Sequence, residues 1–212
     1  PRIIATPRLV PRLSFAEAAE LAYFGAKVLH PSTILPAVER DIPVRILNSM
    51  RPEGTGTLIT ASPSLDGTPL TGLASKRGVT VIDITSTRML MAHGFLRQVF
   101  EVFERFRTAV DVVTTSEVSV SVTVDDRRYV EGITQELSVF AEVVAEGEMA
   151  LLCAVGDRLR DEPEIGARVV GVLEEVPLRM ISQAASRRNI TVVLRQTDLA
   201  HAMQRLHEEF FA

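Results

Sequence analysis

The sequence predicts an α+β fold that repeats one β-α-β-β-α unit, each copy an antiparallel sheet with both helices on one face, as in ferredoxin-like layers. Every second residue from 118 to 124 is valine and the residues between are polar, which is typical of a strand with one buried face. Residues 94–107 carry apolar side chains at the three-four spacing of a helix. The same order of elements then recurs at a constant offset, which places Arg179 over Asp111.

The first 50 residues predict a separate group of short elements. Ser14 and Glu17 match a capping box, so a helix should begin there, and Gly25 is well placed to end it. Further along we expect a strand at 27–29, a helix at 33–40 and a strand at 43–48.

Residues 51–67 are rich in Gly, Pro, Ser and Thr and have little hydrophobic period, which predicts a linker. In the helix at 94–107, the buried face is expected to hold Leu96, Val99, Phe100, Phe103 and Phe106. The other predicted elements are strands at 79–85, 109–114, 118–124, 149–155, 177–183 and 189–194, and helices at 128–140, 164–175 and 198–211.

Charge, cysteine content and hydropathy exclude several classes of function. A net charge of -4 does not indicate binding to nucleic acid or to a charged membrane surface. Cys153 is the only cysteine, so an intramolecular disulfide is impossible and a reducing cytoplasm is expected. No apolar run approaches the roughly 20 residues that span a bilayer. The chain opens at Pro1 without a methionine, and we expect it to be a piece of a longer protein.

Three segments together resemble aspartate kinases, the enzymes that commit aspartate to the synthesis of lysine, threonine and methionine. Residues 13–31, LSFAEAAELAYFGAKVLHP, resemble the last signature segment of the catalytic domain. Residues 87–125, which contain the run VDVVTTSEVSVSV, resemble the first effector-sensing ACT unit of these enzymes. Residues 149–211 resemble the second ACT unit.

The resemblance implies that the first ACT unit is inserted into the second, and that a remnant of an α/β amino-acid-kinase domain precedes both. Residues 71–75 would then form a strand in the sheet of the second unit. The implied domains are the kinase remnant at 1–50, a linker at 51–69, the first ACT domain at 79–147, and a second ACT domain made of 70–78 and 148–212.

A free amino acid presents a carboxylate and an ammonium group, and the first unit offers a partner for each. Backbone N–H groups at the helix start near Gly94 can hold the carboxylate, and Asp111 can accept a charge-assisted hydrogen bond from the ammonium group. Met89, Phe95 and Leu96 also suit a hydrophobic core, and Asp111 also suits a solvated strand end. The expected effector-binding residues are Met89, Ala92, His93, Gly94, Phe95, Leu96, Val110, Asp111, Ser116, Glu117 and Val118.

Lysine is the first choice of effector and threonine the second. The run TTSEVSVSV resembles lysine-sensing members, and Asp111 can bind a second ammonium group, but those members tend to carry a serine where this chain has Ala92. In the second unit, Arg179 replaces Asp111 and Glu164 lies near the helix start, so a zwitterion would meet the wrong charge at both ends. We expect that unit to be structural, and the first unit to form a homodimer with its copy in a second chain.

Lys27 is the candidate for nucleotide binding, because the resemblance places a lysine that lines the ATP site at this position. The sequence has no G-x-x-x-x-G-K-[ST] loop and no counterpart of the family's aspartate-binding residues. We therefore expect no catalytic residue and no kinase activity in this chain alone. The resemblance implies a parent enzyme that uses Mg-ATP to phosphorylate aspartate under feedback inhibition, with a non-catalytic regulatory subunit as the alternative. His30, His201 and His207 form no metal-ligand cluster, so no metal or cofactor is expected.

Overall fold

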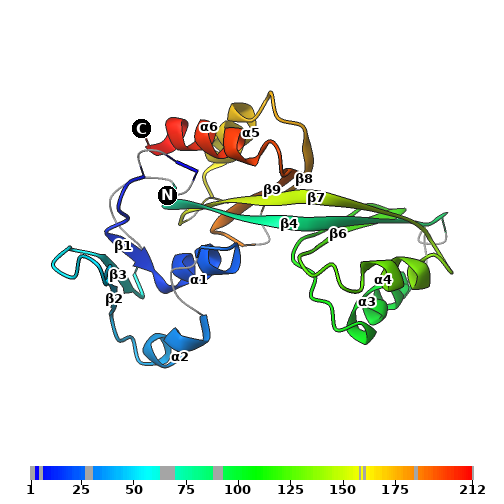
Figure 1. The fold of residues 1–212 in the computed structure, drawn as a ribbon, viewed down its shortest axis with the longest axis horizontal. Helices are drawn as coiled ribbons and strands as arrows, with labels where there is room; N and C mark the ends of the chain where they lie inside the picture. Colours follow the sequence, from blue (N-terminus) through cyan, green and yellow to red (C-terminus); the bar gives the residue numbers. More distant parts are fainter. Residues whose placement is uncertain are drawn as a thin grey trace. The chain divides into compact units, whose positions relative to one another are not determined.

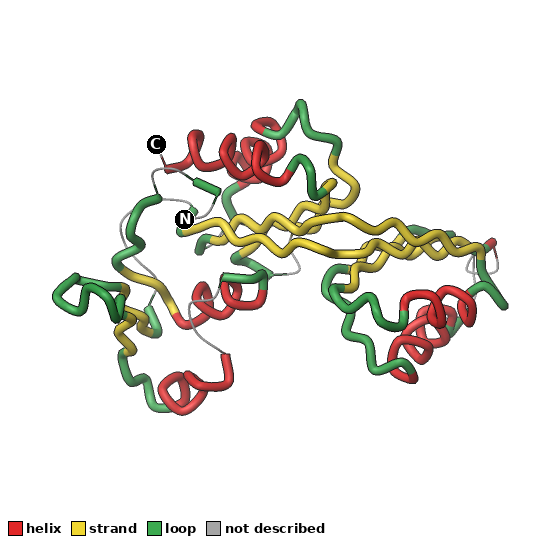
Figure 2. The backbone as a smooth tube through the Cα atoms, in the orientation of Figure 1, coloured by secondary structure: helices red, strands yellow, loops and turns green. Residues whose placement is uncertain are grey.

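The computed structural model describes residues 3–4, 7–26, 31–62, 70–87, 93–157, 159, 161–183 and 186–211. The chain divides into two compact units, which we name by their order in the sequence (Figure 1). The inserted unit is Arg77–Ala150, and the flanking unit combines Pro1–Lys76 with Leu151–Ala212. Two long strands, β4 (Gly72–Thr85) and β7 (Glu142–Val155), contribute residues to both units and are neighbours in the strand order (Figure 2).

The inserted unit is a mixed layer of strands and two helices, with the helices on one side of the sheet (Figure 1). Its strands follow the order β5-β6-β4-β7. Antiparallel pairing runs from Thr80 opposite Val124 to Thr85 opposite Ser119 between β4 and β6. The elements between β4 and β7 are α3 (Phe95–Arg105), β5 (Val113–Thr115), β6 (Ser119–Val124) and α4 (Val130–Leu137).

One apolar core joins both helices to one face of this sheet. The alternating valines of β6 point into it as predicted, and Val120, Val122 and Val124 are fully buried. Each fully buried valine or leucine contributes about 1.5–3 kcal/mol relative to an exposed one. The core consists of Ile82, Ile84, Phe95, Val99, Val102, Phe103, Val120, Val122, Val124, Ile133 and Leu137.

The buried face of α3 is narrower than the sequence predicts. Leu96 and Phe100 were expected inside, but they are 40% and 36% exposed. Phe95 and Val102 are buried instead. The buried stripe thus begins at Phe95 and continues at i+4, i+7 and i+8 to Phe103, the repeat of a helix that faces a single sheet.

The strands of the inserted unit and of the flanking unit belong to one six-stranded sheet, which continues in the flanking unit in the order β4-β7-β9-β8. Strands β8 and β9 pair antiparallel, with a register shift between Leu178 and Met180. The elements that complete this layer are α5 (Pro163–Val172), β8 (Leu178–Gln183), β9 (Asn189–Arg195) and α6 (Leu199–Phe211). Together with the inserted unit, this gives the predicted pair of nested βαββα layers.

The central strands of the flanking unit are covered on both faces. Every residue from Leu151 to Val155 and from Asn189 to Leu194 is buried, whereas a sheet with one open face shows alternate burial. Figure 1 shows the reason: α5 and α6 lie on one face of these strands, and α1 (Phe15–Tyr23) lies on the other. The face of α1 that turns inward carries Phe15, Ala18 and Leu21.

The rest of the flanking unit holds a small second sheet with strand order β1-β3-β2. Strand β3 pairs parallel with β1 and antiparallel with β2, so it is the central strand. The sequence predicted only a linker here, because β3 is short and lies among glycines and prolines. Its partners are distant in sequence: the Thr57 hydroxyl donates to the Val10 carbonyl at 2.7 Å. The elements are β1 (Arg12–Ser14), α2 (Pro31–Glu39), β2 (Val44–Ile46) and β3 (Thr57–Thr60).

Helix α1 has both ends fixed as the sequence predicts. The Glu17 amide donates to the Ser14 hydroxyl oxygen at 3.2 Å, and the Ser14 amide donates to the Glu17 carboxylate at 2.8 Å, which completes the capping box. At the other end, Gly25 takes a left-handed φ of 102°. The Ala26 amide donates to the Leu21 carbonyl at 2.8 Å, as in a Schellman ending.

Most other predicted elements lie within a few residues of their predicted ends. Strand β7 is the largest difference, because it begins at Glu142 rather than Met149. The strand expected at 27–29 lies outside the described residues. None of the helices in the described part of the chain combines the length and apolar content needed to cross a membrane.

Replacing Gly25 with alanine should destabilise the flanking unit. An added Cβ would lie 2.6 Å from the Ser75 carbonyl oxygen, and the left-handed backbone disfavours a side chain, so we expect a loss of about 1–3 kcal/mol in the free energy of unfolding. Gly171→Ala is the matched control, because Gly171 lies within α5 and its new Cβ would touch nothing within 4 Å. That change should stabilise by about 0.5–1 kcal/mol. Urea denaturation compares the two, and equal stabilities would contradict the close approach of Gly25 to β4.

Candidate functional site

The turn between β5 and β6 is held closed and is attached to the end of β4. The Ser116 amide donates to the Ser119 carbonyl at 2.8 Å, the two hydroxyls lie 2.7 Å apart, and the Ser119 amide donates to the Ser116 hydroxyl at 3.1 Å. The Ser86 amide, just after β4, donates to the Val118 carbonyl at 2.9 Å. Three predicted site residues, Ser116, Glu117 and Val118, therefore sit exposed at the end of β4.

The start of α3 offers backbone donors and open space. Gly94 is the N-cap residue, with a φ of 86° and no side-chain capping bond. A Cβ at Gly94 would meet nothing within 4 Å. The first amides of a helix have no partner within the helix and attract negative charge. His93 and Gly94 are both exposed, so a carboxylate can reach these amides.

The helix start and the turn lie at the same end of the inserted unit. The Phe95 ring meets the Phe140 ring edge to face at 5.9 Å, and the Ser86 hydroxyl donates to the Phe140 carbonyl at 3.4 Å. Ser86 also holds Val118, so one short chain of contacts joins both groups. Sequence reasoning missed Ser86 and Phe140, since a serine after a strand and a phenylalanine after a helix carry no distinctive signal.

Val110 and Asp111 lie toward the other end of the β5–β6 hairpin. The Asp111 amide donates to the Thr123 carbonyl at 2.9 Å, whereas Thr115 pairs with Val120 next to the turn. These positions are four residues apart in the chain, which corresponds to about 13 Å of extended backbone. The strand expected at 109–114 is limited to Val113–Thr115. Its start is irregular because the Val112 amide donates to the Thr123 hydroxyl oxygen at 2.9 Å.

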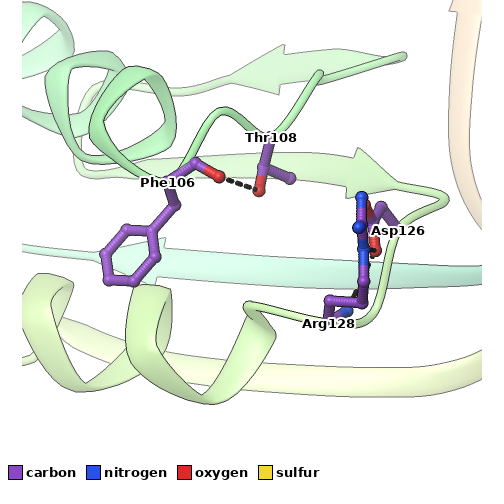
Figure 3. A network of polar contacts seen from close by, with 4 residues as sticks. All are labelled: Phe106, Thr108, Asp126 and Arg128. Atoms are coloured by element: carbon purple, nitrogen blue, oxygen red, sulfur yellow. Dashed lines mark hydrogen bonds and ion pairs between the residues drawn. The ribbon is translucent and has the colours of Figure 1, made fainter.

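Figure 3 shows how local contacts order this far end of the inserted unit. The Thr108 hydroxyl donates to the Phe106 carbonyl at 3.2 Å, at the exit of α3. Beyond β6, the Arg128 Nε donates to both oxygens of the Asp126 carboxylate, at 3.0 Å to Oδ1 and 2.9 Å to Oδ2. Side-chain hydrogen bonds from Arg128 lower the pKa of Asp126 to about 2, so the pair stays ionised in mild acid. Because Asp126 and Arg128 are on the surface, their main effect is to shape the turn into α4.

The equivalent position in the flanking unit is built differently. Helix α5 begins with Glu162 as its N-cap and Pro163 at the first position, and Glu164 follows. Acidic side chains there oppose a second carboxylate. A Cβ at Gly166 would lie 2.8 Å from the Gln183 amide nitrogen, so the end of β8 packs on α5 where a ligand would need room. These features fit the expectation that this unit is structural.

Several other candidate residues can be placed or excluded only in the described part of the chain. Met89, Ala92 and Lys27 lie outside the described residues. Burial raises the pKa of Cys153 to about 12, so its thiol is protonated and unreactive at neutral pH. His201 and His207 lie on α6, where His201 faces Glu175 at 4.0 Å and is 56% exposed. Within the described part of the chain, no group of three or more His, Cys, Asp or Glu side chains could hold a metal ion.

Comparison with known proteins agrees with this architecture. The model of the amino acid kinase family matches residues 1–48, and that of the ACT domain matches residues 152–210. Aspartokinase 3, chloroplastic, of Arabidopsis thaliana is 41% identical over 100% of this chain and 40% of its own length. Lysine-sensitive aspartokinase 3 of Escherichia coli is 38% identical over 100% of this chain and 49% of its own length. The chain thus spans less than half the length of these relatives.

Solved structures extend the likeness to three dimensions. E. coli aspartokinase III in complex with lysine and aspartate, described as the T-state, has a TM-score of 0.87 at 38% identity and matches 100% of this chain and 48% of its own. The R-state complex with aspartate and ADP has a TM-score of 0.90 at 37% identity, with 100% and 49% covered. A putative C-terminal regulatory domain of aspartate kinase from Porphyromonas gingivalis W83 is 35% identical with a TM-score of 0.61, over 66% of this chain and 97% of that domain. The kinase-like start, the two nested layers and these matches lead to one conclusion: this chain belongs to the aspartokinase family.

Proposed function

We propose that this chain is the regulatory part of an aspartokinase and that its inserted unit binds an end-product amino acid, lysine before threonine. The observation that carries the proposal is the meeting of the α3 start with the turn at residues 116–119 at one end of the inserted unit. The likeness to the lysine complex of E. coli aspartokinase III supports the choice of lysine. Threonine is the second candidate, because Ala92 stands where lysine-sensing members tend to carry a serine.

Each group of the effector has a partner of suitable chemistry. The exposed amides at Gly94 bind the α-carboxylate, since a helix start carries partial positive charge. The missing side chain of Gly94 allows the close approach that this contact needs. Glu117 and Asp111 are acidic and bind ammonium groups, of which lysine has two. Threonine has only one, so a site with two carboxylates favours lysine.

The position of Asp111 favours a site shared by two chains. Asp111 is five residues before the turn that holds Glu117, which is too far for one small ligand to contact both in the same chain. Strand β5 is the last strand in its sheet order and presents an edge that can pair with another chain. We therefore place the effector between two inserted units, with Asp111 from one chain and residues 116–118 from its partner.

The whole enzyme would use Mg-ATP to phosphorylate the side-chain carboxylate of aspartate, with feedback inhibition by the bound effector. We assign residues 1–50 to a kinase remnant, with Lys27 lining the ATP site. We also propose that the protein is cytoplasmic. The first ACT domain is assigned to 79–147, and the second to 70–78 with 148–212. The match of the amino acid kinase family to residues 1–48 favours this reading over a non-catalytic regulatory subunit.

Lysine should raise the thermal stability of this chain, and Asp111→Ala should remove most of that rise. Binding stabilises by about 2.7 kcal/mol at a hundredfold excess over the dissociation constant, and a charged hydrogen bond contributes about 1.5–3 kcal/mol. Arg179→Ala is the matched control at the equivalent position of the flanking unit and should leave the rise intact. Melting curves with lysine, threonine and methionine measure the effect. A normal response of Asp111→Ala would place the site elsewhere.

The chain should sediment as a dimer at micromolar concentration. Val113→Lys should weaken the dimer, because Val113 is 39% exposed on the edge strand and two like charges would face each other across a paired edge. Ile181→Lys on β8, the edge strand of the flanking unit, is the control. Analytical ultracentrifugation reads the outcome. A monomer in the presence and absence of lysine argues against a shared site.

The chain alone should form no aspartyl phosphate from ATP and aspartate. Phosphoryl transfer needs both substrates and the metal held in line, and the sequence lacks the residues for this. Coupled detection of ADP release measures the activity. Turnover above the buffer rate would show that residues 1–50 hold more of the kinase site than proposed.

A further inference from the structure

We infer that Glu17 and Glu20 of α1 are positioning residues, which fix α1 in one register on the second ACT sheet and thereby set the point, at Ala26, from which the chain continues to Lys27. The inference rests on the proposed function for the role of Lys27 in nucleotide binding. The effector position of the flanking ACT unit has unsuitable charges. We assign this unit another role, which is to support the kinase-like segment.

Helix α1 runs alongside the start of β4 in the same direction. Glu17 contacts Thr71 near the first turn of the helix, and Gly25 approaches Ser75 just after its last turn. From Glu17 to Gly25 a helix rises about 12 Å. From Thr71 to Ser75 a strand rises about 13 Å. The two spans match, so the whole length of α1 follows β4 rather than crossing it at one point.

The Glu17 carboxylate accepts three hydrogen bonds, of which the one from Thr71 links the start of α1 to the residue before β4. It is 1% exposed, and its Oε2 accepts from the Ser14 amide at 2.8 Å and the Ser14 hydroxyl at 2.7 Å. Its Oε1 accepts from the Thr71 hydroxyl, and the Thr71 amide donates to the Val155 carbonyl of β7 at 2.7 Å. A buried carboxylate that loses a donor is costly. Any slide of α1 along β4 therefore leaves Glu17 partly unsatisfied.

Glu20 makes the second link, one turn further along the helix. The Asn189 side-chain amide, at the start of β9, donates to Glu20 Oε2 at 2.7 Å, and Asn189 is 8% exposed. Burial, and to a smaller extent the charge of Glu20, raise the pKa of Cys153 on β7. The surrounding surface of α1 is apolar, with Ala18 and Leu21 buried. Apolar packing tolerates sliding, whereas a hydrogen bond between the half-buried Glu20 and the buried Asn189 favours one register.

The register of α1 determines the position of the turn that follows it, as far as Ala26. The Gly25 amide donates to the Ala22 carbonyl at 3.2 Å and the Ala26 amide to the Leu21 carbonyl at 2.8 Å, so the turn after α1 is closed onto the helix. Lys27 is the next residue in the chain. Two half-buried polar links and one closed turn thus connect this sheet to Ala26, the residue before Lys27.

The test uses the full-length aspartokinase that carries this chain and measures MgADP affinity by calorimetry. Asn189→Asp sets two carboxylates against each other and should weaken MgADP binding at least about fivefold. The double variant Glu20→Gln with Asn189→Asp exchanges donor and acceptor, restores the hydrogen bond and should recover the affinity. If Asn189→Asp does not fold, Glu20→Ala takes its place in the test. This change removes the acceptor and should also weaken MgADP binding. Glu209→Gln is the control for a structural effect, because Glu209 pairs with Arg168 at 2.6 Å in the same unit but on the helices of the opposite face.

A second readout separates positioning from effector binding. Lysine affinity, measured directly, should stay within about twofold in all variants, while the lysine concentration for half-inhibition should shift in Asn189→Asp and return in the double variant. Unchanged MgADP affinity in folded Asn189→Asp and Glu20→Ala, or no recovery in the double variant, would overturn the positioning role. If the unmodified enzyme binds neither MgADP nor any amino acid, the proposed function itself fails, and the positioning role fails with it.

Discussion

Burial of β7 and β9 on both faces is the constraint on which the flanking unit depends. An apolar sheet face exposed to water is unfavourable by about 25 cal/mol for each Å² of apolar surface. Helices α5 and α6 cover only one face, so α1 must stay against the other (Figure 1). The amino acid kinase match ends at residue 48 and the ACT match begins at residue 152, yet the two matched segments share this core. The boundary between sequence families is therefore not a boundary between folding units.

Local rules explain the parts of the fold that the sequence predicted. The capping box at Ser14 and Glu17 and the left-handed glycine at the end of α1 depend on residues within a few positions of each other, so a pattern in the sequence identifies them. The valine alternation of β6 reports one buried face in the same way. By contrast, β3 depends on partners tens of residues away, and its four residues carry little periodicity. The exposed Leu96 and Phe100 show a related limit, because an apolar side chain on a helix does not reveal how wide the facing surface is.

The candidate site illustrates the difference between sequence neighbours and spatial neighbours. Asp111 and Ser116 are five residues apart in the sequence, but an extended strand carries them to opposite parts of one hairpin. Gly94 and Val118 are more distant in sequence, and the end of β4 brings their segments together through Ser86. The residue types of the site were predictable from ligand chemistry. The strand register separates these residues into two groups, one at the α3 start and the turn, the other at Val110 and Asp111. Neither composition nor any motif in this chain predicts that register.

The nested order of the chain also has a consequence for the way it folds as it is synthesised. Glu20 emerges from the ribosome before its donor, Asn189, which follows 169 residues later. In the interval, the inserted unit is completed and has all the strands and helices of its own core, so it folds first. The contact between α1 and β9 can form only after Asn189 has been synthesised, when the inserted unit is already complete. A folded insert shortens the effective loop between β4 and β9 and lowers the entropy lost when that loop closes, so early folding of the sensor unit assists the assembly of the kinase-like segment.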